Sequence, residues 1–186
     1  MDRRTAVITM ASAAMATLGA GCASSTPADP NDTTLSLVYG YIDGKDAKID
    51  WVEIKQYGEG AGYYQIPYNR KTGVFFSVSI EQGAHQVFKF GNSDTHYMWS
   101  ANGRNATALK VDKPGAYFMG SYKFVRHDQG FFKADKFEMR PAQQPTEAEV
   151  LAIVMRELET DAELTSYVHQ RGYAKARLAQ LGGRRA

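Results

Sequence analysis

The feature that most limits the possible folds is a series of short segments with alternating apolar and polar residues, from Thr33 to about Met139. A period of two places successive side chains on opposite faces of a β-strand. In the clearest segment, Gly73–Ile80, four apolar side chains share one face: Val74, Phe76, Val78 and Ile80. Glycine, proline and aspartate separate the segments, as turns require. The pattern predicts a mainly β domain over residues 33–140, an antiparallel, Ig-like β-sandwich.

Individual strands are expected at residues 35–41, 49–54, 63–68, 73–80, 86–90, 97–100, 106–111, 116–125 and 131–140. The turn residues Asp43 to Asp46 join the first two segments, which are therefore expected to pair as a hairpin. Segment 63–68 contains Pro67, which cannot donate a hydrogen bond to a neighbouring strand. This segment is therefore expected to be a short edge strand.

The pattern changes to helical after Pro145. Thr146 and Glu149 have the spacing of a capping box, in which each side chain binds a free amide at the start of a helix. Apolar residues then recur at helical spacing: Val150, Leu151, Val154 and Leu158. A break near Thr160 and a weaker stripe predict a second helix over residues 162–181. The pair at residues 145–181 either packs on the sandwich or is appended to it as a contact surface for a partner.

Residues 1–21 have the layout of an export signal. Arg3 and Arg4 give a positive start, and the uncharged run Thr5–Leu18 is shorter than the roughly 20 apolar residues of a membrane-spanning helix. The two arginines leave general secretory and twin-arginine export both open. Cys22 is the single cysteine of the chain, so an intramolecular disulfide is not possible.

The stretch Leu18-Gly19-Ala20-Gly21-Cys22 resembles the lipobox of bacterial lipoproteins, in which a cysteine becomes the lipid-carrying first residue. With its β-pattern, the chain resembles the small bacterial envelope lipoproteins of uncharacterised function. This resemblance implies a signal peptide at residues 1–21, lipidation of Cys22 and a polar tether at residues 22–32. Ala23 follows the cysteine, where aspartate favours retention at the inner membrane. The resemblance therefore implies a lipid anchor in the outer membrane, with the protein facing the periplasm.

Composition excludes several functional classes. The formal net charge is +2, and the basic residues are dispersed, so a nucleic-acid partner is not expected. The histidines lack the spacing of metal ligands and are expected to lie on the surface or in turns: His85, His96, His127 and His169. The chain has no Gly-x-Ser-x-Gly sequence, and no phosphate-binding glycine loop precedes a helix. No cofactor and no catalytic residue are therefore predicted.

An aromatic cluster is the candidate binding site. Four tyrosines flank the glycine-rich segment 58–62: Tyr57, Tyr63, Tyr64 and Tyr68. They either close one end of the sandwich or contact a ligand, since tyrosine offers a large ring with a polar tip. The predicted function is a non-enzymatic binding or scaffolding lipoprotein, with an envelope protein or a glycan as partner. The alternative is a periplasmic glycan-acting hydrolase that uses carboxylates such as Glu53 or Asp50.

Overall fold

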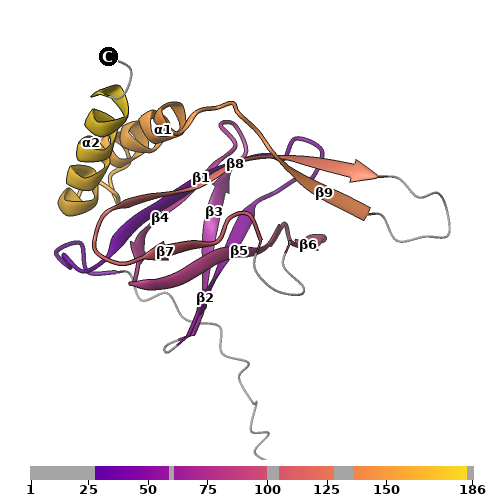
Figure 1. The fold of residues 1–186 in the computed structure, drawn as a ribbon, viewed down its shortest axis with the longest axis horizontal. Helices are drawn as coiled ribbons and strands as arrows, with labels where there is room; N and C mark the ends of the chain where they lie inside the picture. Colours follow the sequence, from indigo (N-terminus) through magenta and orange to yellow (C-terminus); the bar gives the residue numbers. More distant parts are fainter. Residues whose placement is uncertain (1–27, 59–60, 100–104, 128–135, 184–186) are drawn as a thin grey trace, which may run out of the picture.

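The computed structural model describes residues 28–58, 61–99, 105–127 and 136–183 (Figure 1). The predicted signal peptide, Cys22 and residues 22–27 of the predicted tether lie outside the described residues. The strands are β1 (Ser36–Asp43), β2 (Trp51–Tyr57), β3 (Tyr63–Asn69), β4 (Val74–Ile80), β5 (Gly83–Gly91), β6 (His96–Met98), β7 (Leu109–Val111), β8 (Ala116–His127) and β9 (Lys136–Pro141). The helices are α1 (Glu147–Thr160) and α2 (Val168–Gly183). The mainly β class and the C-terminal helical pair are confirmed.

The described strands form one continuous sheet in the order β6-β5-β2-β3-β4-β1-β8-β9, with β7 beside β5. Pairing is antiparallel except between β1 and β8, which run parallel. The sheet curls into a half-barrel, so that Phe90 on β5 packs against Phe124 on β8 and Phe137 on β9. The two separate sheets of an Ig-like sandwich are not confirmed, because the hydrogen-bonded order is unbroken from β6 to β9.

The predicted hairpin between the first two strands is wrong. Strand β2 pairs with β3 and β5, whereas β1 lies between β4 and β8. The cause is that both faces of β1 are apolar: Leu37 and Tyr39 contact the helices, while Val38 and Ile42 face the interior of the curl. A strand that is buried on both faces belongs at the centre of a sheet. The chain after β1 therefore does not form a hairpin but continues to β2, which is separated from β1 by β3 and β4 in the sheet.

Strand β4 also departs from its predicted pattern. Val74, Phe76 and Val78 lie on the helix side as expected, but Ile80 packs in the interior cluster with Phe75. The pairing of β1 with β4 shifts register between Ser36 and Val38. A bulge of this kind changes which face a residue occupies, so the last residue of β4 turns inward.

The apolar stripe of α1 is buried on the outer face of β1 and β4, beside α2 (Figure 1). Its buried residues are Val150, Leu151, Val154, Met155 and Leu158. The capping box is confirmed: the Glu149 N–H donates to Thr146 Oγ1 over 3.4 Å, and the Thr146 N–H donates to Glu149 Oε2 over 2.7 Å. The stripe therefore packs on the sheet and is not available as a contact surface. Neither helix of the described residues is long and apolar enough to cross a membrane.

A charged network joins both helices to the sheet. The Tyr39 hydroxyl donates to Glu147 Oε1 over 2.9 Å, and Arg177 donates to both oxygens of the same carboxylate over 2.7 and 3.0 Å. Burial, together with the neighbouring Glu147, raises the pKa of Tyr39 far above its ordinary value. The ion pair between Arg177 of α2 and Glu147 of α1 is bidentate and partly buried, so it fixes α2 against α1.

The second helix begins at Val168, later than the expected Ala162, because residues 162–166 form turns. Its first turns hold the N-terminal segment 28–35. The Tyr167 hydroxyl donates to the Ala28 carbonyl over 3.0 Å, and the Tyr173 hydroxyl donates to the Thr33 carbonyl over 3.1 Å. Residues 28–32 of the predicted tether are thus held against the folded unit.

Candidate functional site

A groove of about 830 Å³ opens where β3 and β4 separate. The two strands pair only at Tyr68 with Phe75 and at Asn69 with Val74. The next residue of β3 is Pro67, which has no N–H and cannot extend the ladder towards β4. Beyond this point β3 keeps only its β2 partner among the described residues. The predicted edge strand is wrong, because β3 lies inside the sheet between β2 and β4, although residues 63–67 have no β4 partner among the described residues. The N-terminal segment 28–35 forms another wall of the groove.

The register with β2 shows which backbone groups of β3 face the groove. The Tyr68 N–H donates to the Asp50 carbonyl and the Gln56 N–H donates to the Gly62 carbonyl, each over 2.9 Å. Hydrogen-bonded and non-hydrogen-bonded pairs alternate along an antiparallel ladder. Tyr63 and Gln65 stand opposite β2 in non-hydrogen-bonded pairs, so their N–H and C=O groups point away from β2, towards the groove.

The side chains around the groove make it acidic. Four carboxyl-bearing residues line it, and its lining includes no lysine or arginine: Asp29, Asp32, Asp50 and Glu81. Hydrogen bonds from Thr34 lower the pKa of the Asp32 carboxyl. On the β4 side, Ser77 and Ser79 add hydroxyl groups. The groove therefore presents negative charge and unpaired strand edge together.

The four predicted tyrosines do not form one surface. Tyr63 and Tyr64 line the groove, and the Tyr64 hydroxyl donates to Gln56 Oε1 over 2.8 Å. Tyr57 lies on the outer face of the sheet with Tyr63. Tyr68 is half-buried, donates to the Ile42 carbonyl over 2.7 Å and has its pKa raised by burial to about 12. Two of the four thus meet at the groove, and Tyr68 is a core residue.

Beside the groove, the outer face of the sheet carries an aromatic surface with lysines over its rings. The Lys55 ammonium lies 5.1, 5.4 and 5.2 Å from the ring centroids of Tyr57, Tyr63 and Phe88. The Lys89 ammonium lies 5.8 Å from the Trp51 ring. Trp51 also lines the groove, a role that we did not predict from the sequence. Trp51, Lys55 and Tyr57 are separated by even numbers of residues on one strand, so the sequence alone could have placed Trp51 on the same face as Tyr57.

The carboxylates of the hydrolase alternative are each engaged by a basic side chain. Glu53 pairs with Lys89 over 3.2 Å on the outer face, and Asp50 pairs with Arg70. The part of the chain that the structure describes contains no group of three or more histidine, cysteine, aspartate or glutamate side chains placed to hold a metal ion. Cys22 lies outside the described residues.

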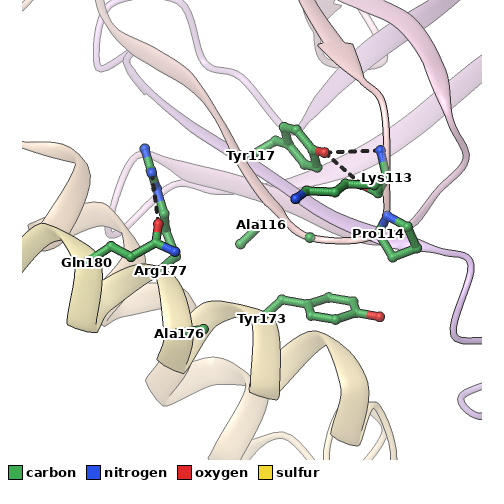
Figure 2. A pocket seen from close by; sticks show the side chains of 9 residues that line it. Lys113, Pro114, Ala116, Tyr117, Tyr173, Ala176, Arg177 and Gln180 are labelled. Carbon is green, nitrogen blue, oxygen red and sulfur yellow. Dashed lines mark hydrogen bonds between the residues drawn. The ribbon is translucent and has the colours of Figure 1, made fainter.

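Two other hollows are smaller. Figure 2 shows one of about 300 Å³ between α2 and the turn before β8, with Tyr117 and Tyr173 on opposite sides. Its Arg177 already binds Glu147, and the Tyr117 hydroxyl donates to the Lys113 carbonyl over 2.6 Å. The other, of about 260 Å³, lies beside Tyr57.

His85 is not a surface residue, contrary to the prediction. Its side chain is buried on β5, with 1 % of the residue exposed. The Nε2 atom lies 2.9 Å from the Glu81 carbonyl, and within the described residues Nδ1 has no hydrogen-bond partner. The other histidines behave as expected, since His96, His127 and His169 are exposed.

Burial lowers the pKa of His85, so protonation in the unfolded state at low pH should destabilise the fold. The stability that depends on the neutral ring is present above the ordinary histidine pKa of about 6.5 and is lost as pH falls below it. We expect the free energy of unfolding to fall, by at most about 1.4 kcal/mol per pH unit, as the pH drops below about 6.5. Urea unfolding of the wild type and of His85→Gln measures this. Equal pH profiles for the two proteins would contradict it.

No protein-family model matches the chain, and no curated protein matches it.

Proposed function

We propose that this chain is a membrane-anchored envelope lipoprotein that binds a partner in the groove between β3 and β4, without catalysis. The groove carries the proposal. Unpaired strand edges are normally short, charged or covered, because they attract other chains. Here five residues of β3 have no partner on one edge among the residues that the structure describes, beside about 830 Å³ of open space, with Tyr63 and Tyr64 at its wall. Such a combination of concavity, aromatic rings and unsatisfied backbone is typical of a binding site.

The anchor rests on the stretch Leu18 to Cys22 and the export-type residues before it. The six Cα-to-Cα steps from Cys22 to Ala28 span at most about 21 Å when the chain is extended. Ala28 itself lines the groove. A lipid on Cys22 would therefore keep the groove close to the bilayer, where envelope partners are concentrated.

The hydrolase alternative gains no support from the geometry. A general acid needs a carboxyl group with a raised pKa. The described carboxyl groups with a shifted pKa, Asp32 and Glu138, both shift downward because hydrogen-bond donors stabilise the charged form. Glu53 and Asp50, the carboxylates that the alternative would use, are each held in an ion pair, with Lys89 and Arg70.

Capture in intact cells tests the proposal. We expect a photo-crosslinking residue at position 65 to capture a partner, because Gln65 is exposed at the groove edge. The same residue at position 123 is the matched control, since Lys123 is exposed on β8 and does not line the groove. Mass spectrometry of the membrane-extracted product should show a chain that begins at Cys22 and carries acyl groups on its sulfur.

Two results contradict the proposal separately. An unmodified Cys22 with residues 1–21 still attached removes the anchor. Equal capture from positions 65 and 123 removes the groove as the binding site.

A further inference from the structure

We propose that the groove receives an extended, basic peptide segment of an envelope partner, which adds as a strand to the free edge of β3. This inference rests on the proposed function and names the class of partner that the groove takes. It depends on three observations: the backbone groups that β3 directs into the groove, the local hydrogen bonds at the β4 edge and the charge of the lining.

The free edge of β3 offers a ladder for one more strand. Tyr63 and Gln65 direct both N–H and C=O towards the groove, and Pro67 offers its C=O, on alternate residues of the same edge. An incoming extended segment presents complementary groups at the same two-residue spacing. Main-chain hydrogen bonds of this kind are the basis of recognition by strand addition.

The opposite edge is less available for pairing. On β4 the Ser79 N–H donates to Ser77 Oγ over 3.3 Å, and the two hydroxyl groups lie 3.1 Å apart. These local hydrogen bonds compete with a strand partner for the β4 backbone. Pro67 blocks the direct pairing of β3 with β4, so the groove stays open and β3 is the edge that accepts a strand.

The charge of the groove selects a basic segment. Asp29, Asp32, Asp50 and Glu81 line it. Arg70 pairs with Asp50, and Lys55 and Lys89 lie over lining rings on the outer face, so the other three carboxyl groups carry the negative charge of the groove. A lysine- or arginine-bearing strand is complementary to this surface, and an acidic strand is repelled. Leu35 and Ile66 add buried apolar side chains to the lining. A segment that alternates basic and apolar residues matches both parts.

A glycan fits the same region less well. Sugars stack on the open faces of aromatic rings, and the rings here are Trp51 and Tyr63. Lys89 and Lys55 already lie over those rings at 5.8 and 5.4 Å. A stacked sugar would have to displace them, whereas a strand on the β3 edge leaves them in place.

The probe is a fluorescein-labelled peptide of about seven residues with alternating lysine and valine, a length typical of a strand. Its binding to the processed full-length protein in detergent is measured by fluorescence anisotropy. We expect the matched glutamate–valine peptide to bind at least about tenfold more weakly, because the lining is acidic. Methylation of alternate peptide amides should weaken binding similarly, because it removes ladder donors.

Gln65→Pro is the decisive variant, with Gln65→Ala as its control. Proline deletes the N–H that points into the groove and leaves the β2 ladder intact, since Gln65 faces Glu53 in a non-hydrogen-bonded pair. We expect Gln65→Pro to weaken lysine-peptide binding about tenfold and Gln65→Ala less than about threefold. Should the proline variant fail to fold, the double variant Asp50→Asn, Glu81→Gln takes its place. It should reduce the ratio between the affinities for the lysine–valine and the glutamate–valine peptide.

Equal binding of the lysine peptide to the wild type, Gln65→Pro and the double variant overturns the proposal. The proposal is also overturned if a chitin oligosaccharide binds in the groove and the lysine peptide does not. In both cases capture from position 65 in cells still supports the proposed function. Loss of that capture contradicts the function itself, so the two failures are distinguishable.

Discussion

Phe90→Ala is expected to lower the free energy of unfolding by about 4 kcal/mol, as is typical when a fully buried phenylalanine is truncated. Phe90 is inaccessible to solvent and lies where the curled sheet meets itself. Its ring stacks on Tyr97 at 5.5 Å and meets the rings of Phe124 and Phe137 edge-on at 6.0 and 5.8 Å. Without it, β5 loses the contacts that hold it to β8 and β9. Urea unfolding followed by far-ultraviolet circular dichroism measures the loss.

Phe88→Ala is the matched control, two residues away on the same strand. Phe88 lies on the outer face, is partly exposed and contacts Tyr63 at 5.5 Å between ring centroids. Its loss should therefore lower the free energy of unfolding by only about 1 kcal/mol. An equal effect of the two substitutions would show that the sheet is not closed through Phe90.

Local signals predicted the helices well. The start of α1 followed from Thr146 and Glu149, because a capping box acts within one turn and needs no distant partner. The apolar spacing of Val150, Leu151 and Val154 gave the buried face for the same reason. The predicted start of α2 was six residues too early, because residues 162–166 form turns, although their mixed apolar and polar composition is also compatible with a helix.

Strand pairing could not be predicted in the same way. The alternation in β1 concealed that Val38, between Leu37 and Tyr39, is as buried as its neighbours. The strands that pair with β1 lie far away in sequence. Tyr39 stands opposite Phe76 of β4 on one side and Phe118 of β8 on the other. A turn such as Asp43 to Asp46 permits a hairpin but does not require one.

Only part of the groove could be predicted from the sequence. Pro67 explains why the pairing of β3 with β4 stops, but the predicted edge strand lies inside the sheet, between β2 and β4. Of the predicted tyrosine cluster, Tyr63 and Tyr64 line the groove, and their role in binding stays a prediction. The acidic lining was not predicted, since Asp29, Asp50 and Glu81 come from three distant segments that only the fold brings together.

Leu151→Asp is expected to destabilise the protein by at least about 4 kcal/mol, a large part of the 5–15 kcal/mol that holds a typical domain folded. Leu151 has no exposed surface and packs in the cluster that includes Leu37, Tyr39 and Val74. Aspartate there removes the apolar contacts and buries a carboxylate among them. Helix α1 should leave the sheet, and the exposed face of β1 and β4 should bind a hydrophobic dye.

Ala152→Asp introduces the same side chain at the next position of α1, where the residue is exposed. Its effect should stay below about 1 kcal/mol, because a solvated carboxylate contacts no apolar neighbour. The contrast separates a packed helix from one that offers its apolar stripe to a partner. Were Leu151→Asp to leave the free energy of unfolding unchanged while abolishing partner capture from position 65, α1 would be a contact surface, and its packing on the sheet would be wrong.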